Sequence, residues 1–310
     1  MDKHLIKLKE LYKYFNKYLH GKEKALKLSL LTLFSRGHLL VEDVPGLGKT
    51  TLALAIAKSM GLSFGRIQCT NDLLPTDITG LSIFNKKDNS FEFLKGPIFN
   101  NIVLVDEINR ATPKTQSALL ESMGEKQVTI EGVTYKLPQP FFVIATQNPA
   151  EQHGTFPLPE SQLDRFLMKI NLGYPEKKHE LEILKGGSSR GSISRSQPVL
   201  SKQELLDLIS FIKNDIFVDD KIYNFILDFA NATRQNENFL IGLSTRAMLS
   251  IITAGKASAF MSGRDYVIPE DILDYMKYTV THRVVLKNNI HENEKAEIVK
   301  SLLESVPLHA

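Results

Sequence analysis

Hydrophobic and polar positions divide the chain into two parts with different periodicity. Short apolar runs at residues 38–42, 102–105 and 141–145, with further expected strands at 64–68 and 166–170, alternate with helical patterns in the first part. This alternation predicts a five-stranded parallel sheet covered by helices on both faces, an α/β fold. Polar residues directly follow the runs at 102–105 and 141–145, as at strands whose carboxyl ends open onto a site.

Two predicted β-hairpins interrupt the alternation. The first pairs residues 81–84 with 91–94 across a polar stretch, and the second pairs 127–130 with 133–137 across Glu131-Gly132. Glycine in such a tight turn can adopt a positive φ angle. A plain α/β sheet does not need these insertions near 81–94 and 127–137, so they are either decoration or working surfaces.

Helical periodicity dominates both ends of the chain. Residues 1–35 read as helical, with lysines along a solvated face, and helical patterns resume at Ser201. Residues 186–198, rich in Gly, Ser and Arg, read as an exposed loop. We therefore expect an α/β core over residues 1–173 and an α-helical domain over residues 174–310.

Composition narrows the class of protein. The 310 residues are 43% hydrophobic and 24% charged, which is typical of a globular chain, and the formal net charge of +3 is too small to indicate a nucleic-acid binder. Cys69 is the only cysteine, so no intrachain disulfide can form and a reducing compartment is expected. With no leader-like segment and no apolar run of about 18 residues, we expect a cytoplasmic protein without membrane contact.

A phosphate-binding loop follows the first apolar run and opens a helix. Its predicted nucleotide-contacting residues are Val44, Pro45, Gly46, Leu47, Gly48, Lys49, Thr50 and Thr51. The glycines allow backbone N–H groups to surround phosphate oxygens, Lys49 can reach the β- and γ-phosphates, and the Thr50 hydroxyl can bind Mg²⁺. The usual pattern has glycine where this chain has Asp43. That position lies on the strand side of the loop, so nucleotide binding is expected to survive.

Two carboxylates end the apolar run at 102–105. We expect Asp106 to hold Mg²⁺ and Glu107 to activate the attacking water as general base. Asn148, after the next run, is the candidate for positioning the same water.

Two arginines complete the candidate catalytic set. Arg165 precedes a strand and cannot easily reach its own phosphate site, which favours an arginine finger offered to a neighbouring subunit. Arg246 begins a helix of the second domain and could contact the γ-phosphate.

Together these motifs resemble an AAA+ ATPase, and more narrowly a MoxR-type ATPase, from about Gly21 to Leu286. The matching stretches are 38–46, 106–111, 145–149, 154–160 with 164–166, and 282–283. The resemblance implies a five-stranded AAA+ core with a small α-helical lid. By this resemblance, Lys49 and Thr50 correspond to the Walker A motif, and Asp106 and Glu107 to the Walker B motif. Asn148 corresponds to sensor 1. Arg165 corresponds to the arginine finger and Arg246 to sensor 2.

The resemblance also implies ATP and Mg²⁺ as cofactors and a chaperone-like role. The expected partners are further copies in a ring, most simply a hexamer, a von Willebrand factor A-domain protein and a client protein. Two alternatives stay open: a DNA-associated motor and a nucleotide-binding scaffold that does not hydrolyse. Against DNA stands the acidic turn at Glu131-Gly132, and against the scaffold stand Lys49, Glu107 and Arg165.

Overall fold

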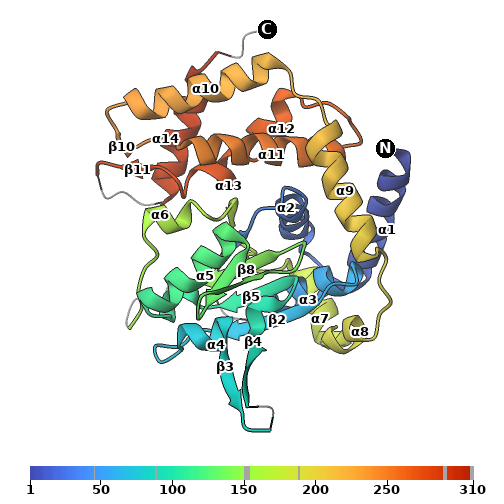
Figure 1. The fold of residues 1–310 in the computed structure, drawn as a ribbon. Helices are drawn as coiled ribbons and strands as arrows, with labels where there is room; N and C mark the ends of the chain where they lie inside the picture. Colours follow the sequence, from blue (N-terminus) through green and yellow to red (C-terminus); the bar gives the residue numbers. More distant parts are fainter. Residues whose placement is uncertain (45, 88, 150–153, 188, 289–291, 308–310) are drawn as a thin grey trace.

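The computed structural model describes residues 1–44, 46–87, 89–149, 154–187, 189–288 and 292–307. Pro45, one of the predicted loop residues, lies outside this part of the chain. Figure 1 shows an α/β layer with a helical bundle above it and a thin hairpin projecting below. Among the described residues, no helix combines the length and apolar character needed to cross a bilayer.

A five-stranded parallel sheet forms the centre of the first part, as predicted. Its order is β2 (Phe64–Gln68), β5 (Ile102–Asp106), β8 (Phe142–Gln147), β1 (Leu39–Glu42) and β9 (Met168–Ile170). Successive side chains enter opposite cores: Leu39 and Val41 pack with one cluster, Leu40 with the other. The near-continuous apolar runs thus reflect burial on both faces.

Different helices cover the two faces. One core contains side chains of α1 (Asp2–Tyr18), α2 (Glu23–Phe34) and α3 (Lys49–Ser59), and the other contains side chains of α4 (Pro75–Thr79) and α5 (Pro113–Glu125). Short 3-10 turns at Pro97–Phe99 and Ile108–Arg110 link these elements to the sheet. Helix α1 buries Leu8, Leu11 and Phe15 and leaves its lysines at the surface, as the amphipathic pattern predicts.

Both predicted hairpins are present. Strands β3 (Gly80–Asn85) and β4 (Ser90–Lys95) form the hairpin that projects from the body, and β6 (Gln127–Ile130) pairs with β7 (Val133–Lys136). Glu131 and Gly132 both have positive φ angles, +51° and +79°, which a two-residue hairpin turn requires.

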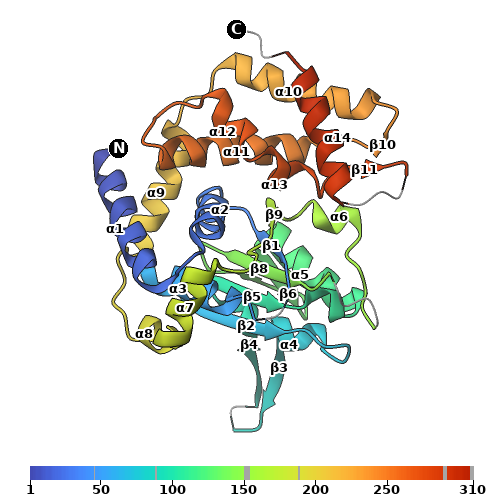
Figure 2. The same ribbon diagram turned by 180° about the vertical axis from the view of Figure 1, so that it is seen from behind.

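The C-terminal part is a helical bundle with a small two-stranded sheet. Its elements are α9 (Lys202–Asp215), α10 (Asp220–Gln235), β10 (Phe239–Ile241), α11 (Thr245–Met261), α12 (Pro269–Leu273), α13 (Met276–Val280), β11 (Val285–Leu286) and α14 (Glu292–Ser305). The bundle packs on the core through α2 and β9, which contact α11 and α13, and Figures 1 and 2 show α2 between sheet and bundle. Sequence reasoning missed the β10–β11 pair because each strand is only two or three residues long.

The prediction of an exposed loop at residues 186–198 was wrong in part. Helix α7 (Lys177–Gly186) enters this range, α8 (Arg190–Ser194) lies within it, and Ile193 is fully buried against the rest of the protein. Helix α8 packs on α3, and the N–H groups of Val199 and Leu200 donate to the Ser59 carbonyl. Tertiary packing fixes this segment, although its Gly- and Ser-rich composition has low helix propensity. The domain boundary near residue 173 stays a prediction.

Candidate nucleotide site

A polar cavity of about 200 Å³ opens at the carboxyl ends of the sheet strands. Seven of the predicted site residues are among the described residues that line it: Gly46, Gly48, Lys49, Thr50, Asp106, Glu107 and Asn148. The topology explains the convergence, because β1, β5 and β8 are parallel neighbours and their polar ends meet at one edge.

The phosphate loop has the backbone that anion binding needs. Gly46 and Gly48 have φ angles of +89° and +91°, a region that other residues enter only with strain. Helix α3 begins at Lys49, so its free N–H groups and positive dipole end face the cavity. The Lys49 ammonium donates to the Asp43 carbonyl at 2.6 Å, and burial lowers the pKa of Lys49 against the opposing effect of nearby carboxylates.

The Asp43 side chain turns away from the phosphate cavity. Its Oδ2 accepts hydrogen bonds from the N–H groups of Leu172 and Gly173, the second at 3.0 Å. Lys22 donates to the Gly173 carbonyl at 2.5 Å, which ties the α1–α2 connection to the same segment. Asp43, which stands where the usual pattern has glycine, therefore joins the phosphate loop to Leu172 and Gly173, the segment that follows strand β9.

Asp106 is paired with a cation that sequence reasoning did not identify. The Arg66 Nε donates to Asp106 Oδ2 at 2.7 Å, and Thr146 lies 3.4 Å from the other carboxylate oxygen. Thr50 and Asp106 supply only oxygen ligands, the kind that Mg²⁺ prefers, so the donor set fits the predicted ion. Bound there, Mg²⁺ would neutralise phosphate charge.

Glu107 occupies a strained position with several hydrogen bonds. Its φ of +57° and ψ of +51° are left-handed values, which cost a residue with a side chain about 1–3 kcal/mol. Its N–H donates to Thr146 Oγ1 at 2.9 Å, while Oε2 accepts from Gln68 at 2.9 Å and from Arg110 at 3.2 Å. The neighbours therefore hold the carboxylate at the cavity wall.

A second, larger cavity continues from the phosphate cavity. It measures about 1190 Å³, shares Gly46, Gly48 and Arg190 with the phosphate cavity, and is bordered by the end of α1, the α1–α2 connection, α7 and α8. Its walls combine apolar side chains such as Leu47 and Leu172 with polar ones. Such a cavity beside a phosphate loop can receive a nucleoside.

The two arginines of the catalytic prediction lie together, outside the described lining of the phosphate cavity. Arg165 and Arg246 line a separate surface cavity between α5 and the helical bundle. Arg165 donates to the Leu120 carbonyl, and Arg246 lies 3.7 Å from Asp164. In this conformation neither contacts the phosphate loop of its own chain, so a γ-phosphate role for Arg246 stays a prediction.

Asp164, which lies beside these two arginines, connects the core to the helical bundle. Besides Arg246, it pairs with the buried Arg283 at 3.3 Å and accepts from the Ser244 hydroxyl at 3.3 Å. His282 and Arg283 also bond to the Phe166 carbonyl, at 2.9 and 2.8 Å. His282 and Arg283 thus dock the bundle onto Phe166, just before strand β9.

Four residues of the phosphate cavity were missed as site residues: Arg66, Gln68, Thr146 and Arg190. Arg66 and Gln68 alternate on β2, and polar side chains in an otherwise buried strand were the available signal. The Arg190 Nε lies 3.3 Å from Thr51 Oγ1, a contact made by the segment predicted to be a loop.

Comparison with known proteins agrees with this architecture. Residues 38–168 match the family described as "ATPase family associated with various cellular activities (AAA)", and residues 231–302 match the AAA lid domain. The chain is 46% identical to the uncharacterized protein YeaC of Bacillus subtilis, with 94% of this chain and 92% of YeaC covered. It is 40% identical to Chaperone MoxR1 of Mycobacterium tuberculosis, with 93% and 78% covered.

A solved structure gives the same result. A Cytophaga hutchinsonii protein, classed provisionally as an ATPase, superposes with a TM-score of 0.88 at 40% identity, over 98% of this chain and 96% of that one. Similarity over nearly the whole length, together with a Walker-type cavity and a helical lid, leads to one assignment: the chain belongs to the MoxR family of AAA+ ATPases.

Proposed function

We propose that this protein binds and hydrolyses ATP with Mg²⁺ and uses the energy to remodel or assemble protein partners. One observation carries the proposal: Lys49, Thr50, Asp106, Glu107 and Asn148, from separate segments, line one cavity beside a helix N-terminus. A site that only binds nucleotide needs the loop and the lysine. It does not need a second carboxylate at the position of the attacking water.

Each residue of the cavity has its own role in the proposed reaction. Lys49 balances phosphate charge, and the N–H groups at the α3 N-terminus donate hydrogen bonds to the phosphate oxygens. Glu107 takes a proton from the attacking water after its Oε2 leaves the hydrogen bonds from Gln68 and Arg110. Asn148 orients that water.

Hydrolysis is tested with two active-site variants and one control. Lys49→Ala should abolish nucleotide binding at micromolar protein, and Glu107→Gln should bind nucleotide without turnover. Lys58→Ala, at the other end of α3, is the matched control and should behave like wild type. Phosphate release that is equal in wild type and Glu107→Gln would support the scaffold alternative and defeat the proposal.

We propose further that the active form is a ring, most simply a hexamer, in which Arg165 and Arg246 complete the site of a neighbouring subunit. Their shared surface, away from their own phosphate cavity, supports this arrangement. Mixing Arg165→Ala subunits with Lys49→Ala subunits should restore part of the activity, since some interfaces then pair an intact loop with an intact arginine. Mixed rings without any recovery would exclude Arg165 as a finger.

The projecting hairpin supports a protein client over DNA. Its exposed side chains include Phe84 and Phe91, the latter 70% exposed, with Leu81, Ile83 and Leu94. Apolar patches of this kind bind polypeptide, whereas a DNA-tracking hairpin presents mainly cations to phosphates. A salt-dependent affinity for DNA would refute this.

The family resemblance supports a von Willebrand factor A-domain protein as partner; pull-down with a co-encoded A-domain protein tests it. A cytoplasmic location stays a prediction.

A further inference from the structure

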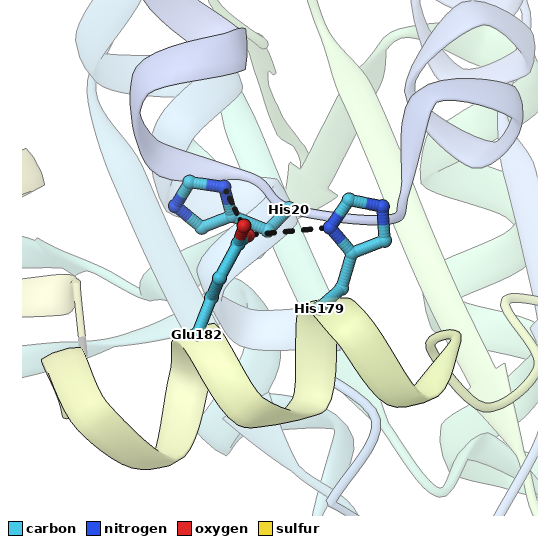
Figure 3. Close-up of side chains that lie close together, drawn as sticks. All are labelled: His20, His179 and Glu182. Atoms are coloured by element: carbon cyan, nitrogen blue, oxygen red, sulfur yellow. Dashed lines mark hydrogen bonds and ion pairs between the residues drawn. The ribbon is translucent and has the colours of Figure 1, made fainter.

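The imidazoles of His20 and His179 converge on the carboxylate of Glu182 (Figure 3), and His20 and Glu182 line the large cavity beside the phosphate loop. His20 belongs to the α1–α2 connection, and His179 and Glu182 belong to α7. The Nδ1 atoms of His20 and His179 lie 3.4 and 3.3 Å from the same oxygen, Glu182 Oε2. All three ligand atoms lie within 4.8 Å of one another.

The backbone holds this arrangement before any ligand binds. His179 and Glu182 are three residues apart on α7, so their side chains share one face of the helix. Gly21, with φ +66°, brings the α1–α2 connection against the His179 ring; a Cβ at Gly21 would lie 2.8 Å from His179 Cδ2. Lys22, the nearby cation of this connection, is directed at the carbonyls of Leu172 and Gly173.

We propose that His20, His179 and Glu182 bind a divalent transition-metal ion of the zinc class, with water as fourth ligand. Two imidazole nitrogens and one carboxylate are a common zinc donor set with an open position. Bonds of about 2.0–2.1 Å in a tetrahedron place neighbouring ligand atoms about 3.4 Å apart. The two nitrogen–oxygen separations in the structure, 3.4 and 3.3 Å, are close to that spacing, and the third pair of ligand atoms lies within 4.8 Å.

The ion would join two walls of the nucleoside cavity. His20 and Glu182 both line it, one from the α1–α2 connection and the other from α7. A metal bond between them fixes α7 over the cavity, so the nucleotide meets a wall that is already ordered. This coupling rests on the proposed function, and by linkage metal and nucleotide then raise each other's affinity by the same factor.

Zinc binding is measured first, without nucleotide, by titration against a chelating indicator. Wild type should bind one Zn²⁺ at this site. His20→Ala, His179→Ala and Glu182→Gln should each weaken binding at least about tenfold, since even outer-shell changes cost about 10–100-fold. His4→Ala, which removes a histidine of α1 whose ring contacts Phe211 in a tilted arrangement, is the matched control and should bind like wild type.

All three side chains are partly exposed, so the variants are expected to fold, and circular dichroism of the metal-free proteins checks this. Zinc affinity that is equal in wild type, His20→Ala and His179→Ala would overturn the site. This result does not depend on ATP hydrolysis, so it is separate from failure of the proposed function.

A second measurement tests the coupling. The affinity of a fluorescent ATP analogue should rise at least about fivefold with Zn²⁺ in wild type, and stay constant in His179→Ala. The variant controls for zinc acting at the phosphate cavity, which it leaves intact. An equal zinc effect in both proteins would overturn the coupling.

Discussion

Replacing Asp43 distinguishes a role of its carboxylate in the stability of the fold from a role in nucleotide binding. In Asp43→Ala the carboxylate no longer accepts from the N–H groups of Leu172 and Gly173. Hydrogen bonds to a charged acceptor contribute about 1.5–3 kcal/mol each, and the partial exposure of Asp43 lets water replace part of that. We expect the free energy of unfolding to fall by about 2–3 kcal/mol in total.

Nucleotide binding should change much less. The phosphate-facing groups are Gly46, Gly48 and Lys49, and Lys49 contacts the main-chain carbonyl of Asp43, which alanine retains. Asp43→Ala should therefore bind ATP within about threefold of wild type, a change below 1 kcal/mol.

Thermal unfolding without nucleotide and titration with a fluorescent ATP analogue measure the two effects. At about 2–4 °C per kcal/mol for a large domain, Tm should fall by roughly 4–12 °C. Asp43→Asn keeps one oxygen acceptor and should lose less than half of that. An unchanged Tm in Asp43→Ala would refute the reasoning, and a large loss of nucleotide affinity at constant Tm would place the carboxylate at the ligand instead.

Three further predictions concern the cavity and the core. Glu107→Gln should lower ATP hydrolysis at least about 100-fold, measured as phosphate release, because the proposed general base is lost. Arg66→Ala frees Asp106. Because the Arg66 side chain is half exposed, the pair is worth at most about 1 kcal/mol, and the Mg²⁺ concentration for half-maximal hydrolysis should fall up to about fivefold. A rise would show that Arg66 helps to hold the ion. His38 is buried neutral, with Nδ1 accepting from the Val143 N–H, and burial lowers its pKa from 6.5 to about 4. Below pH 6.5 the unfolded chain thus binds a proton that the folded chain excludes, so stability should fall by about 1.4 kcal/mol per pH unit down to about pH 4. Denaturant unfolding of His38→Asn should show a shallower pH slope, and parallel slopes would contradict the assignment.

The sheet and the phosphate cavity were predictable because local patterns specify both. Apolar runs of four or five residues mark buried strands, and Gly48-Lys49-Thr50 marks the turn into α3. Parallel strands in one sheet end at one edge, so placing Asp106 and Asn148 near that turn required no knowledge of side-chain contacts.

The missed residues depend on strand register and tertiary packing. Arg66 meets Asp106 only because β2 pairs with β5 so that Gln68 lies opposite Asp106. Nothing in the local sequence specifies that pairing. Arg190 approaches the loop because burial of Ile193 holds α8 against α3, which composition alone could not indicate.

The contacts of Asp164 suggest how nucleotide state and lid position are connected. Its carboxylate balances Arg246 and Arg283 of the lid, while the next residue, Arg165, is the proposed finger. A γ-phosphate in a neighbouring subunit is also an anion, and it would compete with Asp164 for Arg246, whose side chain is 62% exposed. Arg283 is buried and would stay paired. In a ring, ATP in one subunit would then loosen one of the two ion pairs that Asp164 makes with the lid in the next. Hydrolysis would restore that pair without undocking the lid.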